Sequence, residues 1–238
     1  MIKKINLFIG YFCYIMAFLL TCYYLVLEFS IIDITSPLVR LRIIGIIILL
    51  MYFGCFFFIK NNNLVRDKLV KFNMIVWFSL YIIMLLNLTL FDKYFGRSGG
   101  MLYMTDTLSV RNYFETSFNI VPFETIDNYI IAFKNDNLLV SDFLYNIVGN
   151  LLAFMPFAFF LPRLFKRINK FNKFFIIVSC CILLVEFLQL LTMSGSFDVD
   201  DYILNILGAS LLYGIINNSL IKKYIDKIIY FQYKKMLV

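Results

Sequence analysis

The 238-residue sequence contains no histidine. Mechanisms that need an imidazole base, and zinc or haem sites with histidine ligands, are therefore excluded. Charged residues are also scarce, at 16% of the chain against roughly 25% in soluble domains. Because 62% of the residues are hydrophobic, the composition excludes a water-soluble globular domain, a disordered chain and a collagen-like chain.

The cysteines carry no sign of a redox or metal centre. All five lie inside apolar runs and none has CxxC spacing: Cys13, Cys22, Cys55, Cys180 and Cys181. Thiols in such surroundings behave as small hydrophobic side chains.

The apolar residues form long runs close to the ~20 residues that cross a bilayer. They predict six helices, at about residues 5–27, 43–59, 73–91, 143–161, 174–192 and 202–219. We therefore expect an all-α fold, a polytopic bundle of transmembrane helices. The last run carries Asp201 and Asn205 near its start, so a partly immersed or re-entrant segment is the alternative there.

The basic residues lie between the apolar runs, which argues against nucleic-acid binding and indicates membrane orientation. Sixteen fall on one side of the predicted membrane: Lys3, Lys4, Lys60, Arg66, Lys68, Lys71, Arg163, Lys166, Arg167, Lys170, Lys173, Lys222, Lys223, Lys227, Lys234 and Lys235. Six fall on the other: Arg40, Arg42, Lys93, Arg97, Arg111 and Lys134. The positive-inside rule then predicts that both termini are cytoplasmic. We expect a multi-pass protein of the cell membrane.

This topology divides the chain into four regions. Residues 1–91 hold three helices, residues 92–142 an exterior loop, residues 143–219 the remaining helices and residues 220–238 a basic cytoplasmic tail. Within the loop, residues 119–133 are apolar enough to form an amphipathic or re-entrant segment in the outer leaflet.

The run 143–161 carries polar residues within the membrane. Asn146 and Asn150 are four residues apart in the run 143–161 and share one helix face. Gly149 with Ala153 suits a close helix contact, and Pro156 predicts a kink. The alternative to a functional site is simple packing, in which asparagines hold neighbouring helices together.

In the run 174–192, Glu186 and Gln189 also share a face. A carboxylate in the membrane costs about 3 kcal/mol or more unless it is paired, hydrated or protonated, so Glu186 is a candidate acid or base. A protonated Glu186 hydrogen-bonded to a neighbouring helix is the structural alternative.

An acidic cluster precedes the last apolar run. Asp198, Asp201, Asn205 and Gly208 follow one helical stripe, with Asp200 just beside it. Three carboxylates suit a hard divalent cation, with Asp198, Asp200 and Asp201 as candidate ligands, or a cationic group. The alternative is an exposed acidic cap in which Asp198 begins the helix.

The predicted topology brings these polar residues to similar depths below the exterior face. They are Asn146, Asn150, Glu186, Gln189, Asp201 and Asn205. We therefore expect one binding site, which Asp198 and Asp200 would complete at its mouth.

Three ordered motifs resemble the VanZ-like family of integral membrane proteins, named for a protein associated with teicoplanin resistance. They are Asn119, Pro122, Phe123, Thr125 and Ile126; then NIVGNLLAFMPFAFFLP; then EFLQ followed by GSFDVDDYILNILGA. The resemblance covers roughly residues 119–215. The chain departs from the family pattern at Ala158, where a glycine is common, and at Ser194, where some members have arginine.

The resemblance implies a role in the cell envelope and lowered susceptibility to lipoglycopeptides, without a mechanism. Three hypotheses remain open. The site binds a membrane lipid, a lipid-linked envelope precursor or a glycopeptide antibiotic; or Glu186 and a divalent cation on the aspartates act on a phosphorylated lipid; or the chain is a small transporter.

Overall fold

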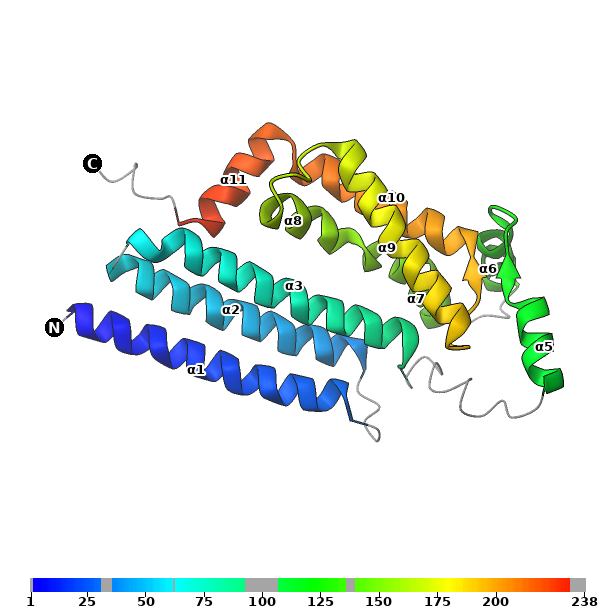
Figure 1. Ribbon diagram of the computed structural model, residues 1–238, viewed down its shortest axis with the longest axis horizontal. Coiled ribbons are helices and arrows are strands. Elements are labelled where there is room, and N and C mark those ends of the chain that lie inside the picture. The colour runs from blue at the N-terminus through cyan, green and yellow to red at the C-terminus, as the bar shows by residue number, and fades with distance from the viewer. Residues whose placement is uncertain (1, 31–35, 62, 93–106, 136–139, 232–238) are drawn as a thin grey trace. The chain divides into compact units, whose positions relative to one another are not determined.

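The computed structural model describes residues 2–30, 36–61, 63–92, 107–135 and 140–231. The predicted all-α fold is confirmed, because six helices in this part of the chain are long and apolar enough to cross a membrane. The helices group into two compact units (Figure 1). The first unit is Met1–Asn87 with Ser219–Val238, and the second is Leu88–Asn218.

Each predicted apolar run overlaps an observed helix or helix pair. The helices are α1 Ile2–Glu28, α2 Pro37–Asn61, α3 Arg66–Leu90, α7 Val140–Ala153 with α8 Met155–Leu164, α9 Phe171–Leu191 and α10 Val199–Ile216. The helix α3 begins at Arg66 instead of residue 73 because its first turns carry charged residues, which an apolar count leaves out. The last run forms one continuous helix, α10.

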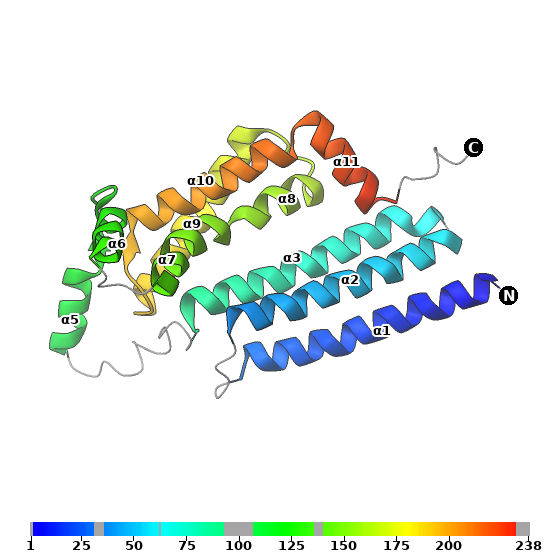
Figure 2. The same ribbon diagram turned by 180° about the vertical axis from the view of Figure 1, so that it is seen from behind.

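In the first unit, α1, α2 and α3 lie side by side in both views (Figures 1 and 2). Asn73 of α3 joins all three helices. The Tyr14 hydroxyl donates to Asn73 Oδ1 over 2.9 Å, and Asn73 Nδ2 donates to the Met51 carbonyl over 3.1 Å. A short 3-10 helix, η1 Asn63–Val65, leads into α3, and α11 Ser219–Ile229 completes the unit.

A buried ion pair closes one end of this unit. The Arg40 guanidinium lies 3.6 Å from the Glu28 carboxylate, and both side chains are buried. The Asn87 side chain donates to the Glu28 carbonyl over 2.6 Å. These contacts join the end of α1, the start of α2 and the last turns of α3.

In the second unit, α10 is the central helix and contacts α6, α7, α8 and α9. Its core is aromatic: the rings of Phe174 and Tyr213 stack at 4.4 Å between centroids, and Ala209 beside them is fully buried. The remaining elements precede α7 or α10. They are α5 Thr107–Thr116, β1 Phe118–Asn119, α6 Glu124–Lys134 and β2 Phe197–Asp198. Residues 93–106 of the predicted exterior loop lie outside the described residues.

The predicted kink at Pro156 is confirmed as a break in the helix. Phe154 separates α7 from α8, and Pro156 lies in the first turn of α8. Proline has no amide hydrogen, so it fits the start of a helix and interrupts the hydrogen bonding of the turn before it.

The close contact expected at Gly149 is not found, because a Cβ there would meet nothing within 4 Å. The close approach lies at Gly208 of α10, where a Cβ would overlap the Leu151 carbonyl oxygen of α7. The backbones of α7 and α10 therefore meet directly at this point.

Candidate functional site

A two-residue parallel sheet joins the start of α10 to the segment between α5 and α6. In this sheet Phe118 pairs with Phe197, and Asn119 pairs with Asp198. The Phe197 amide donates to the Ser117 carbonyl over 2.9 Å, and the rings of Phe118 and Phe197 lie 6.0 Å apart. The sheet brings the first sequence motif against the acidic motif, although they are far apart along the chain.

Asp198 is the N-cap of α10, as predicted. Its Oδ1 accepts from the Asp200 amide over 2.9 Å and from Asn119 Nδ2 over 3.1 Å. Its Oδ2 accepts from the Thr125 hydroxyl over 2.7 Å. The side chain is buried. Asp198 therefore caps α10 and also binds Asn119 of β1 and Thr125 at the start of α6, so it is not the exposed cap of the structural alternative.

Asp200 binds the N-terminus of α6. Its two carboxylate oxygens accept from the Phe123 amide over 2.5 Å and from the Ile126 amide over 3.0 Å. Phe123 is the N-cap residue just before α6; its φ is 69°, and its side chain makes no capping hydrogen bond. The first amides of a helix lack intrahelical partners and attract negative charge. Asp200, which is fully buried, supplies the missing acceptor from another helix.

Asp201 faces α7, where Asn150 Nδ2 donates to its Oδ1. One turn further along α10, Asn205 Nδ2 donates to the Asp201 carbonyl over 2.7 Å. Asn205 is buried, and its Oδ1 has no hydrogen-bond partner among the described residues. Asn150 and Asp201 remain half-buried. The predicted stripe of Asp201, Asn205 and Gly208 thus lines the contact between α10 and α7.

The polar residues of α9 are buried together near its end. Glu186 and Gln189 are 4% and 5% exposed, which agrees with the predicted shared face. Gln189 Nε2 donates over 3.2 Å to the carbonyl of Thr89, which belongs to the second unit. Asn146 lies half-buried one turn before Asn150 on α7. The hydrogen bonds therefore join Asn150, Asp201 and Asn205, whereas Gln189 bonds to Thr89.

The three aspartates of the acidic motif have different partners. Asp198 faces the segment after α5, Asp200 faces α6 and Asp201 faces α7. Within the described ranges, no group of three or more His, Cys, Asp or Glu side chains is placed to hold a metal ion. The carboxylates predicted as metal ligands are thus used by the protein's own amides and hydroxyls.

Three residues that sequence reasoning did not place in the site take part in it. Asn119 and Thr125 both donate hydrogen bonds to Asp198. Asn119 Nδ2 also donates to the Thr125 hydroxyl over 2.7 Å. Their motif was recognised, but their polar role was not. The Tyr113 hydroxyl donates to the Gly195 carbonyl, and burial raises the pKa of this phenol, which keeps it a donor. Nothing in the sequence pointed to Tyr113.

Two sequence stretches that carry most of the site residues contain no basic residue. The sequence has no lysine or arginine between Lys134 and Arg163, or between Lys173 and Lys222. These two stretches hold α7, α9 and α10 with Glu186 and the acidic motif. The charged residues within these two stretches are therefore all acidic.

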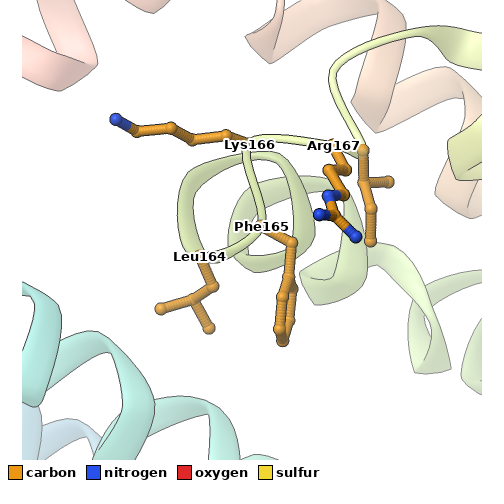
Figure 3. A pocket seen from close by; sticks show the side chains of 5 residues that line it. Leu164, Phe165, Lys166 and Arg167 are labelled. Carbon is orange, nitrogen blue, oxygen red and sulfur yellow. The ribbon is translucent and has the colours of Figure 1, made fainter.

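Two surface hollows lie elsewhere in the second unit. One lies at the start of α9, and the other is formed by the loop after α8 and includes Leu164, Phe165 and Lys166. Figure 3 shows Lys166 extending away from the other side chains of that loop. Neither hollow is lined by a predicted site residue.

Comparison with known proteins agrees with the motifs. The chain is 29% identical to Protein VanZ of Enterococcus faecium over 157 residues. This aligned region covers 64% of this chain and 81% of that protein. No solved structure matches the chain significantly. Residues 77–222, more than half of the chain and all of the site described above, match the VanZ/LLP1 family. The chain therefore belongs to the VanZ/LLP1 family.

Proposed function

We propose that the chain is a multi-pass protein of the cell membrane whose polar site, formed by α7, α9 and α10, binds the polar head of an envelope amphiphile. Candidate ligands are an envelope lipid, a lipid-linked precursor or a glycopeptide antibiotic. The observation that carries the proposal is the pair of Asn150 and Asp201, a half-buried amide and carboxylate between two membrane-spanning helices.

The chemistry of this pair supports a ligand that donates hydrogen bonds. A carboxylate only accepts, and Asn205, one turn further along α10, has an Oδ1 acceptor buried without a partner in the described part of the chain. Buried polar atoms are normally satisfied, so an unmet acceptor is a reason to expect a ligand or an ordered water there. Hydroxyl, amide and ammonium groups of sugars, peptides and lipid heads match these acceptors.

Orientation supports an exterior position for the site. Sixteen of the basic residues counted above lie on the side predicted to be cytoplasmic and six on the other. The start of α10 then faces the outside, where envelope precursors and glycopeptides meet the membrane. Binding there would change how such a drug reaches its target and would lower susceptibility to lipoglycopeptides, as the resemblance to the VanZ-like family implies.

A metal-dependent enzyme has less support. Asp198 and Asp200 each accept hydrogen bonds with both carboxylate oxygens, which leaves them poorly placed as metal ligands. Glu186 remains a candidate acid or base on α9, since it is buried close to Gln189.

The test measures retained ligand and drug susceptibility together. Asn150→Ala, Asp201→Asn and the double variant are purified in mild detergent, and native mass spectrometry identifies any lipid that remains bound. The same variants are expressed in cells challenged with teicoplanin. If both residues serve one site, the double variant loses little more than either single variant, with a coupling of about 0.5 to 3 kcal/mol in ligand affinity.

The matched control is Asp67→Asn, an equally conservative change at an exposed side chain at the start of α3. It should leave both measurements unchanged. Additive losses in the double variant would show that Asn150 and Asp201 act separately in packing. Equal losses in Asp67→Asn would show that the effects are not specific to the site.

A further inference from the structure

The helix α11 is amphipathic along its whole length. Because each helical residue turns by about 100° around the axis, its side chains divide into two faces. One face is apolar and consists of Leu220, Ile221, Tyr224, Ile225, Ile228 and Ile229. The other is charged and consists of Lys222, Lys223, Asp226 and Lys227. A helix of this pattern fits a boundary between a polar and an apolar phase.

Much of the apolar face is exposed. Leu220 and Tyr224 are 69% exposed and Ile228 is 49% exposed, and these three residues follow one stripe at intervals of four. None of the residues of α11 is buried. In water such a stripe would be unfavourable, so we expect it to be covered in the membrane-bound protein.

The charged face is basic. It carries three lysines against Asp226, and the sequence adds Lys234 and Lys235 after the helix. Lysines beside an apolar face are typical of helices that lie on anionic bilayers, because the apolar side chains enter the acyl boundary and the ammonium groups reach the headgroups.

The connections of α11 keep it at the level of a membrane surface. It begins at Ser219, directly after the membrane-spanning α10 ends at Ile216. Its far end is held to α2, where the Tyr52 hydroxyl donates to the Ile228 carbonyl over 3.3 Å and the rings of Tyr52 and Phe231 lie 4.7 Å apart. Since α2 is itself a membrane-spanning candidate, α11 cannot lie far from the bilayer.

We propose that α11 is an interfacial anchor that lies in the membrane surface and recruits anionic lipid headgroups through Lys222, Lys223 and Lys227. The occupant of its exposed face is the bilayer itself. The inference does not depend on the ligand site at the start of α10, because it uses neither the residues nor the membrane face proposed there.

The test uses the full chain in vesicles of phosphatidylcholine and phosphatidylglycerol. The sequence has a single tryptophan, so Tyr224→Trp in a Trp77→Phe background places the only indole on the apolar face. Either lipid is then supplied with brominated chains, which quench a nearby indole. Enrichment of anionic lipid should make quenching by brominated phosphatidylglycerol about twofold stronger than by brominated phosphatidylcholine at equal content, and salt should reduce the difference.

Two triple variants separate specific recruitment from general charge. Lys222→Gln, Lys223→Gln and Lys227→Gln together should abolish the difference between the two lipids. The matched change of Lys166, Lys170 and Lys173 to glutamine, in the basic loop before α9, should leave it intact. Thermal unfolding of each variant in detergent checks that the fold survives.

Three results would overturn the proposal. Absence of quenching by both lipids would place the apolar face outside the bilayer. Equal quenching by both would remove the headgroup preference. Quenching that falls as the protein-to-lipid ratio rises would indicate that a second copy of the chain covers the helix.

Discussion

At the scale of single residues, Asp200 is a fully buried side chain of the site whose two carboxylate oxygens both accept hydrogen bonds. It accepts from two backbone amides at the start of α6. Both amides are among the orphan donors of a helix N-terminus, and both oxygens of the carboxylate are used. The left-handed conformation of Phe123, which is unfavourable for a bulky residue, is held between these bonds and the two-residue sheet.

We therefore expect Asp200→Asn to destabilise the protein. The amide can accept with one oxygen only, and its NH2 group would face a backbone N–H. The loss combines a helix cap with an unsatisfied buried donor and should reach about 2 to 4 kcal/mol in the free energy of unfolding. Thermal unfolding in detergent and protease cleavage within residues 107–135 measure it.

Asp127→Asn is the matched control, because Asp127 is an exposed aspartate in the first turn of α6, the helix whose N-terminus Asp200 binds. Its effect should stay within about 0.5 kcal/mol. If Asp200→Asn unfolds at the same temperature as this control, the bonds to α6 do not contribute to stability and Asp200 would return as a ligand candidate.

The roles of Asp198 and Asp200 differ in how far the sequence could predict them. The N-cap at Asp198 is local, since a carboxylate just before an apolar run accepts from an amide two residues on. The partners of Asp200 are backbone amides of a distant segment, and backbone amides leave no signature in a sequence. The hydrogen bonds of Asn119 could not be predicted for a similar reason. They depend on the parallel pairing of β1 with β2, and strands of two residues each are too short to be recognised in a sequence.

At the scale of helices, the contact of α7 with α10 depends on one position. Gly208 lies against the carbonyl of Leu151, and Asn150 beside it reaches Asp201. The absence of a side chain at Gly208 therefore sets the distance between the two backbones and with it the hydrogen bond of the candidate site.

Gly208→Ala should push α7 and α10 apart. Because the neighbouring atom belongs to the backbone, rotation of a side chain cannot relieve the overlap. We expect a loss of about 1 to 3 kcal/mol or more in the free energy of unfolding, together with loss of the Asn150–Asp201 contact. Thermal unfolding and the retained-lipid measurement report these two effects separately.

Gly149→Ala and Gly214→Ala serve as controls, since a Cβ at either position meets nothing within 4 Å. Both should be neutral or stabilising, because alanine favours the helix more than glycine does. Equal damage from all three substitutions would show that helix packing at Gly208 has no special role.

Sequence reasoning predicted the helices better than their contacts. The break before Pro156 follows from the missing amide of proline and was expected. The small-residue contact was expected at Gly149, yet it lies at Gly208, because spacing identifies small residues on a helix without indicating which neighbour crosses there. The stripe that contains Gly208 was recognised for its polar members only.

At the scale of the whole molecule, the number of spans was predictable because apolar length is a local property of the sequence. The division into two units could not be predicted, because it depends on contacts between residues far apart in the sequence. The helix α11 belongs to the unit of the N-terminal helices, which it contacts through Tyr52 and Phe231. Its amphipathic pattern is visible in the sequence, but the basic residues of the tail suggested only orientation.

The last prediction concerns that orientation. The basic residues on the two sides, sixteen against six, predict that both termini lie in the cytoplasm. In a variant without the five native cysteines, Gly99→Cys should react with a membrane-impermeant maleimide in intact cells, whereas Lys170→Cys should react only after permeabilisation. Permeabilised cells must label both positions, which controls for accessibility. The reverse pattern would turn the start of α10 towards the cytoplasm, where Asn150 and Asp201 could not meet an extracellular glycopeptide.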